Sequence, residues 1–218
     1  MTARAPVLLT GFDAFAGEAE NPSLLIARAL DGEQIAGRRV IGAALPTVFT
    51  QALAGLDALL DAHRPALVLA LGQAGGRAEI SLERVAINLI DARIQDNAGD
   101  QPVDAAVIDG APNAYFSTLP LKAMLKRLHE AQIPAALSHS AGTFVCNQVF
   151  FGLAHRLATQ PRHARGGFIH VPYLPEQAAR HPGAPSLPLA TMVEAIRICI
   201  EAALLTRDDL HFAGGSTH

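Results

Sequence analysis

The sequence predicts a single three-layer α/β/α sandwich built on a twisted, mainly parallel sheet. Short apolar runs alternate with segments of helical periodicity along most of the chain. One run, residues 67–71, is apolar throughout, as expected for a central strand covered on both faces. Half of the 218 residues are hydrophobic, which is enough for one large core. We therefore expect one domain over residues 1–218, with its core at about 7–205.

The first third of the chain sets up the alternation. The expected strands are residues 6–10, 40–45 and 67–71, and the expected helices are residues 22–30 and 49–61. Asn21 is a natural N-cap for the first helix, with Pro22 in its first turn. Ligands bind beyond the carboxyl ends of parallel strands, so the loops 11–17 and 72–77 are candidate walls of a site.

Residues 80–117 interrupt this pattern. Residues 82–89 and 103–107 resemble strands, and the turn-rich segment 96–102 separates them. We expect an extended excursion with antiparallel pairing.

The alternation then returns. We expect a helix at residues 121–131, strands at 135–138 and 167–172, a helix from Val145 and a final helix near 189–203. Cys199 lies on the apolar stripe of the last helix and is expected in the core. The glycine-rich tail, residues 212–218, is expected to fray.

Composition narrows the functional class. Seventeen Lys and Arg residues against twenty Asp and Glu, with no basic run, argue against nucleic acid as a partner. The apolar run near the N-terminus is far too short for a signal peptide, and no uninterrupted apolar stretch approaches the length needed to cross a membrane. We expect a soluble cytoplasmic protein in which both cysteines are free thiols.

Cys146 is the first candidate for chemistry. It follows a strand and a turn of small residues and stands at the start of a predicted helix. Unpaired N–H groups and the helix dipole favour a thiolate there, so we expect a lowered thiol pKa. The alternative is a small buried side chain that happens to follow a turn.

A cysteine nucleophile needs a base and a group that orients the base. His170 ends a strand just before a proline, and Glu83 and Asp91 are the carboxylates nearest to strand-like segments. A carboxylate bonded to one imidazole nitrogen leaves the other free to accept the thiol proton. Three nearby arginines are open to interpretation as surface charges or as ion pairs, and spacing does not choose among them: Arg77, Arg84 and Arg93.

Four blocks of sequence carry a resemblance to a known family. They are residues 9–23, 72–88, 140–147 and 167–175. The order and spacing of these four blocks resemble those of the pyroglutamyl-peptidase I family. Its members are cysteine peptidases that remove an N-terminal pyroglutamyl residue from peptides. The resemblance covers roughly residues 7–205. It also implies a homotetramer. We expect no metal and no cofactor, because Cys146 and His170 lack a set of partners at metal-ligand spacing.

The resemblance assigns roles to four residues. The nucleophile would be Cys146, the base His170 and the orienting carboxylate Glu83. The oxyanion would be held by the backbone N–H of the cysteine and by Arg93. The reaction implied is amide hydrolysis through a thioester.

The expected substrate is a neutral five-membered lactam, so its pocket should be aromatic with a few amide groups. The residues expected there are Phe12, Phe15, Asn21, Gln73, Ile94, Phe144 and Val145. Asn21 is equally well explained as a helix cap, whereas packing in the core is the less favoured alternative for the phenylalanines. A charged pocket would argue against this substrate.

The chain departs from the family pattern at three positions. Ala14 replaces a common proline, Ala16 stands where glycine is common, and Gln95 replaces a proline. These changes are expected to loosen the loops around the site without removing a catalytic group.

Two other classes remain open. A glutamine amidotransferase also pairs Cys, His and Glu, but here Val145 and Asn147 flank the cysteine in place of glycines. A non-enzymatic binding or redox-sensing protein would use the same thiol.

Overall fold

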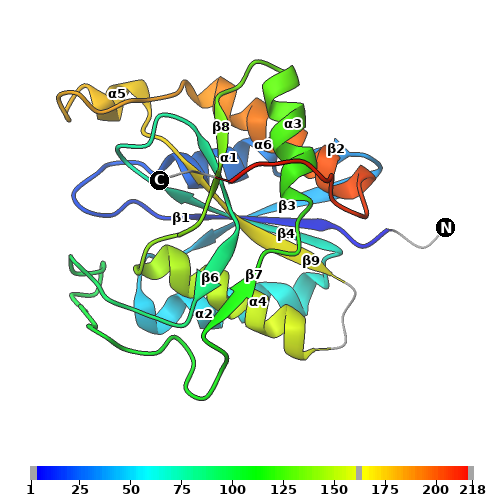
Figure 1. Cartoon of the computed structure of the whole chain (residues 1–218). Coiled ribbons are helices and arrows are strands. Elements are labelled where there is room, and N and C mark those ends of the chain that lie inside the picture. Colours follow the sequence, from blue (N-terminus) through cyan, green and yellow to red (C-terminus); the bar gives the residue numbers. More distant parts are fainter. Residues whose placement is uncertain (1–3, 161–163, 216–218) are drawn as a thin grey trace.

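The computed structural model describes residues 4–160 and 164–215, in which seven strands form one sheet (Figure 1). In spatial order they are Gln34–Ile35 (β2), Arg38–Leu45 (β3), Val7–Phe12 (β1), Leu67–Gln73 (β4), Arg165–Val171 (β9), Ile80–Glu83 (β5) and Ala135–Ser138 (β8). Strands β3, β1, β4 and β9 run parallel. Strand β5 pairs antiparallel with β9, and β8 runs parallel with β5. The mainly parallel sheet with an antiparallel part is confirmed.

Helices cover both faces of the sheet (Figure 1). One face carries Pro22–Leu30 (α1), Leu121–Glu130 (α3) and Leu189–Leu205 (α6), and the other carries Phe49–His63 (α2) and Val145–Thr159 (α4). Side chains alternate along β1 because successive residues of a strand point to opposite faces. Leu9 therefore packs with α1 and α6, and Leu8 packs with α2 and α4. These two cores complete the three layers.

The segment 80–117 differs from the sequence prediction. The strand expected over residues 82–89 is divided into β5 and Val85–Ile87 (β6), and β6 pairs antiparallel with Ala114–Phe116 (β7). The strand expected at 103–107 is wrong, since only an isolated bridge joins Ile90 to Ala105. Asp104 adopts a left-handed φ of 48°, which breaks an extended run at this point.

The end of the chain follows the prediction in one respect and departs from it in another. Cys199 is fully buried on α6, as its stripe predicted. The tail expected to fray contacts α3 instead, because the Lys122 ammonium lies 5.5 Å from the Phe212 ring centroid and bonds to the Phe212 carbonyl. The remaining tail residues, 216–218, lie outside the described residues.

Candidate active site

Cys146 lies in the first turn of α4, directly after the N-cap residue Phe144 and Val145. The turn that leads there from β8 contains Gly142 with φ of 79°, a conformation that glycine adopts without strain. The sulfur lies against Gly72 on β4, where a Cβ atom, if the residue had one, would come within 2.8 Å of Sγ. The absence of a side chain at Gly72 makes room for the thiol over the sheet.

His170 lies on β9, directly beside Gly72 of β4. Gly72 and His170 are register partners in the parallel pair β4 and β9, so their side-chain positions project from the same face. Adjacent strands lie about 4.8 Å apart. The sheet register therefore places His170 on the strand next to the residue that the Cys146 sulfur covers, on the α4 side of the sheet.

Glu83 is the last residue of β5, and its carboxylate is hydrogen-bonded to the imidazole of His170. Its Oε1 lies 2.7 Å from Nδ1 of His170. Glu83 is completely buried and His170 is 4% exposed, so neither group exchanges this partner for water. In a neutral ring, Nδ1 donates its proton to the carboxylate and Nε2 is left as the acceptor.

Arg77 is the arginine that joins this arrangement. Its Nη1 lies 2.6 Å from Glu83 Oε1 and 3.3 Å from the hydroxyl of Ser138, and its Nη2 donates to the carbonyl of Ser140 at 3.0 Å. Within the described chain, neither Arg84 nor Arg93 bonds to Glu83. Arg77 thus links the carboxylate to the turn that precedes Cys146.

The surroundings of Glu83 keep it ionised. Burial favours the neutral acid, but the hydrogen bond and charge of His170, helped by the charge of Arg77, hold the pKa of Glu83 below its ordinary value. The carboxylate is therefore a fixed negative charge next to the imidazole.

The same charge acts against the thiol. Burial and the nearby negative charge of Glu83 raise the pKa of Cys146 to about 12, and Arg77 and a backbone N–H offset this only in part. The expectation that the helix start lowers this pKa was wrong. The sequence showed the favourable helix terminus, but not that neighbouring atoms desolvate the thiol of this half-buried residue or that a carboxylate lies near it.

A small cavity opens beside the sulfur. Its lining residues are Phe12, Phe15, Asn21, Thr47, Gln73, Phe144, Val145 and Cys146. It offers about 10 Å³ to the centres of water molecules, which is room for about one water. Apart from the thiol its lining carries no ionisable group. Six of the seven residues expected in the pocket lie together here, and Thr47 is an addition.

Arg93 and Ile94 line a different cavity. This second space, of about 260 Å³, is bounded also by Asp91, Thr143 and Phe144. The two cavities share Phe144. Arg93 is exposed, and the structure places it outside the cavity next to the sulfur.

Aromatic rings form the wall between these spaces and the core. Phe144 meets Phe49 edge-on, with ring centroids 5.1 Å apart, and lies 6.3 Å from Phe15. Phe168 lies 4.9 Å from the imidazole of His170. Phe49 and Phe168 were missed from the sequence. The period-two spacing of Phe168 and His170 on one strand was the available signal for the second.

Asn21 serves the local fold with its whole amide. Its Oδ1 accepts hydrogen bonds from the backbone N–H of Ser23 at 3.1 Å and from the Ser23 hydroxyl at 2.7 Å. Its Nδ2 donates to the carbonyl of Asp13 at 3.0 Å. The helix-cap interpretation is confirmed, and the residue lines the cavity as well.

The loop departures are visible at Ala16 and around Gln95. Ala16 adopts a left-handed φ of 54°, a conformation that costs a non-glycine residue about 1 kcal/mol. Near Gln95, Asn97 donates to the Ala14 carbonyl at 2.8 Å, and Asp96 accepts from the backbone N–H of Phe49 at 2.8 Å. The first bond ties the segment after Gln95 to the loop that holds Ala14, and the second ties it to the start of α2.

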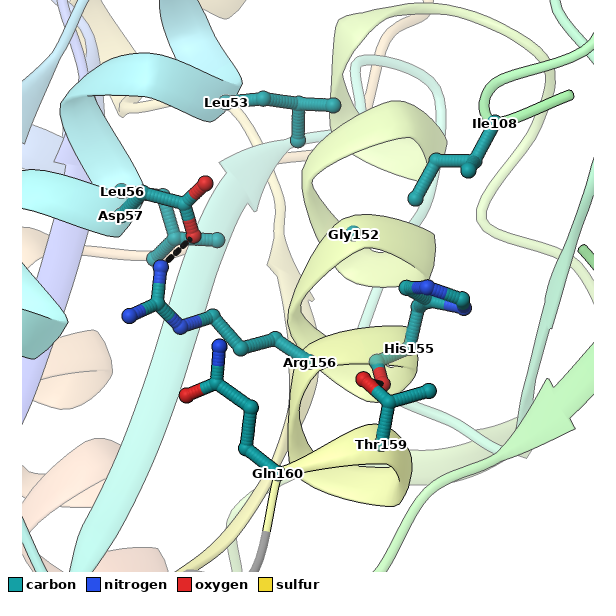
Figure 2. A pocket seen from close by; sticks show the side chains of 9 residues that line it. All are labelled: Leu53, Leu56, Asp57, Ile108, Gly152, His155, Arg156, Thr159 and Gln160. Carbon is teal, nitrogen blue, oxygen red and sulfur yellow. Dashed lines mark hydrogen bonds and ion pairs between the residues drawn. The ribbon is translucent and has the colours of Figure 1, made fainter.

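Another cavity, of about 220 Å³, lies between α2 and α4, away from the thiol (Figure 2). Arg156 pairs there with Asp57 and Asp61, and the His155 Nδ1 lies 2.9 Å from the hydroxyl of Tyr115. The residues that line this space include no cysteine, and its histidine is bonded to a tyrosine hydroxyl and not to a carboxylate, so it lacks the thiol and the imidazole–carboxylate pair of the first site.

Metal clusters and membrane spans are both absent from the part of the chain that the structure describes. The described residues contain no cluster of three or more His, Cys, Asp or Glu side chains arranged to hold a metal ion. Among these residues there is also no helix with the length and apolar character needed to span a membrane.

Comparison with known proteins identifies relatives of the whole chain. The family model described as pyroglutamyl peptidase matches residues 5–206. A pyrrolidone-carboxylate peptidase of Cupriavidus taiwanensis is 57% identical over 97% of this chain and 99% of its own length. A protein of the same name from Klebsiella pneumoniae is 54% identical over 98% of this chain and 100% of its own.

Solved structures agree with the sequence relatives. Pyroglutamyl peptidase I of Bacillus amyloliquefaciens superimposes with a TM-score of 0.92 at 44% identity, over 95% of this chain and 100% of that one. A mutant pyrrolidone carboxyl peptidase from the hyperthermophile Pyrococcus furiosus gives 0.90 at 45% identity, over 92% and 98%. The chain belongs to the pyroglutamyl peptidase family.

Proposed function

We propose that this protein is a cysteine exopeptidase that hydrolyses the amide bond after an N-terminal L-pyroglutamyl residue of peptides. The observation that carries the proposal is the 2.7 Å hydrogen bond between His170 Nδ1 and Glu83 Oε1, on the strand beside the one that the Cys146 sulfur covers. Thiol, imidazole and carboxylate in this order form a nucleophile, a base and an orienting group.

The thiol pKa of about 12 means that Cys146 keeps its proton in the resting protein. His170 then takes this proton through Nε2 as the sulfur attacks the pyroglutamyl carbonyl, and Glu83 stabilises the imidazolium formed. The imidazolium protonates the departing amine. Water, deprotonated by the imidazole, attacks the thioester and releases pyroglutamate and the thiol.

The tetrahedral oxyanion needs donors close to the sulfur. We assign this role to the backbone N–H groups at the start of α4 and, by family resemblance, to Arg93. Support for Arg93 comes from its loop, since Asp91 N–H donates to the Thr143 carbonyl at 3.0 Å and the Thr143 hydroxyl donates to the Asp91 carbonyl at 2.7 Å. These bonds hold the Arg93 loop to the turn before Cys146.

The neutral aromatic cavity suits a lactam ring, which carries no charge. The proposed pocket residues are Phe12, Phe15, Asn21, Gln73, Ile94, Phe144 and Val145. Because the cavity holds about one water, entry of the ring has to move the aromatic side chains apart. We also propose, from the resemblance alone, a cytoplasmic homotetramer, which sedimentation of the purified protein would test.

The function is tested by release of a fluorophore from a pyroglutamyl amide. We expect turnover by the wild type and a loss of about 10⁴-fold or more in Cys146→Ser, because the weaker hydroxyl nucleophile replaces the thiol. Cys199→Ala is the matched control, since this other cysteine is buried in the α6 stripe, and it should keep its activity.

Thiol alkylation should inactivate the wild type and Cys199→Ala alike. A folded wild type that releases no fluorophore, or a Cys146→Ser variant that works as well as the wild type, would contradict the proposed function.

A further inference from the structure

Gln177 is a buried polar residue close to the proposed pocket. It lies in the short helix Pro175–Ala178 (α5) and is 2% exposed. Its Oε1 accepts from the backbone N–H of Leu174 at 3.0 Å. Its Nε2 faces three oxygens: Oε1 of Gln73 at 3.0 Å, the carbonyl of Glu20 at 3.2 Å and Oε2 of Glu18 at 3.3 Å.

These neighbours fix which way the Gln177 amide points. A backbone N–H can only donate, so the atom next to Leu174 has to be the oxygen. The carbonyl of Glu20 and the carboxylate of Glu18 can only accept, so the nitrogen has to face them. A reversed amide would oppose oxygen to oxygen in a buried place, which is costly.

The orientation of Gln177 determines the orientation of Gln73. Because Gln177 offers an N–H, the atom of Gln73 that meets it has to be Oε1. The Nε2 of Gln73 makes no hydrogen bond within the described residues, and Gln73 lines the cavity beside Cys146. The oxygen of this amide already accepts a bond from Gln177, whereas its nitrogen still has its protons to offer to a ligand.

Asn21, the other amide of the cavity, has the same polarity. Its oxygen is taken by two donors of Ser23, and its nitrogen uses one proton on the Asp13 carbonyl. The amides of the lining therefore have their acceptors occupied and their remaining N–H groups unused. A ligand with a carbonyl oxygen at this edge would complete them.

We propose that Gln177 is a specificity-determining positioning residue, which turns the Gln73 amide so that its N–H donates to the lactam carbonyl of the substrate. This inference rests on the proposed function. A proline ring has a methylene in place of that carbonyl, and would leave the donor unpaired in a desolvated pocket. Such an unpaired group penalises the wrong ring strongly.

The test uses three neutral ring fragments as competitive inhibitors of the pyroglutamyl amide assay. Cyclopentanone has the carbonyl alone, 2-pyrrolidone has the carbonyl and the N–H, and methylenecyclopentane has neither. In Gln177→Met, a variant of similar length without the donor, we expect the inhibition constants of both carbonyl rings to rise about tenfold. The inhibition constant of methylenecyclopentane should stay within about twofold of its value for the wild type. For the pyroglutamyl amide itself, kcat should change less than KM.

Two further variants make the result decisive. Gln73→Met removes the donor itself and leaves the sequence of α5 unchanged, so it should give the same pattern even if Gln177→Met folds poorly. Arg180→Ala is the control, because it removes a contact to Glu18 on the same segment and leaves the Gln177 to Gln73 bond in place. Its inhibition constants for the three fragments and its turnover of the pyroglutamyl amide should match those of the wild type.

Equal weakening of all three fragments would assign Gln177 a packing role and overturn the inference, as would unchanged inhibition in both Met variants. Fragment binding can be followed separately by protein thermal shift. A wild type that does not cleave the pyroglutamyl amide defeats the proposed function, whereas the carbonyl preference of the cavity would still be measured by that binding.

Discussion

The two sides of the proposed site are held by different kinds of structure. Cys146, His170 and Glu83 stand at a helix start and on paired strands, where sheet register determines their positions. Phe15 and Asn21 instead belong to a loop and a helix cap, fastened by hydrogen bonds between loops. The difference indicates that the chemical side has one fixed geometry and that the recognition side can adjust. Changes to the first should lower kcat, and changes to the second should alter KM or stability.

After loss of the nucleophile itself, the largest effect should come from the carboxylate of the fixed side. In Glu83→Gln we expect kcat to fall by roughly 10²–10³-fold with little change in KM, because the imidazole loses both its orientation and the charge that stabilises its protonated form. Steady-state kinetics at neutral pH would measure this. A rise in KM at constant kcat would contradict the assignment of Glu83 to the side of the site that carries the chemistry.

The same variant should change how stability depends on pH. The pKa of Glu83 is lower in the folded protein than in the unfolded chain, so the group contributes stability above its unfolded value, near 4.5, and loses it as pH falls through the folded value. The free energy of unfolding of the wild type should therefore decline more steeply with acidification than that of Glu83→Gln. Urea denaturation at several acidic pH values would show it.

Arg77 should give a smaller and chemically specific effect. Its charge lowers the pKa of the Cys146 thiol, whereas Glu83 raises it. Alkylation by iodoacetamide at a fixed pH below the thiol pKa follows the thiolate fraction, so it should slow in Arg77→Met and quicken in Glu83→Gln.

Arg77→Lys separates charge from structure. It keeps the positive charge and loses the planar fork that also reaches Ser140, so its alkylation rate should lie near that of the wild type. We expect kcat of Arg77→Met to fall about tenfold. Equal alkylation rates in the Met and Lys variants would indicate that Arg77 acts only by holding the turn.

The smallest effect should come from the adjustable side. Ala16→Gly removes the strain of the left-handed φ of 54° and should raise the free energy of unfolding by about 0.5–1 kcal/mol, with kcat unchanged. Thermal melting of both proteins would measure the change. A melting temperature that falls would mean that the methyl group of Ala16 stabilises the loop more than its backbone strain destabilises it.

Local sequence was a good guide to the elements and a poor guide to what depends on several of them. The start of α4 at Val145 and the strand that carries His170 followed from apolar periodicity and a stopping proline. The partner of Glu83 among the arginines did not, because it depends on the loop after β4 meeting the turn after β8 in space.

The same reason explains the error about the thiol. Helix position is local, whereas the desolvation of the Cys146 thiol and its nearness to Glu83 are set by packing across the sheet. Gln177 was missed because four residues are too few to give a helical pattern, and the oxygens that its amide nitrogen faces lie at least 104 residues away in sequence.

Gly72 has a consequence for attempts to redesign this enzyme. A methyl group at that position would come within 2.8 Å of both the Cys146 sulfur and the Phe168 ring. The smallest possible enlargement would therefore push on the nucleophile and on the aromatic neighbour of the base together. Libraries aimed at new substrates should therefore keep glycine at this position.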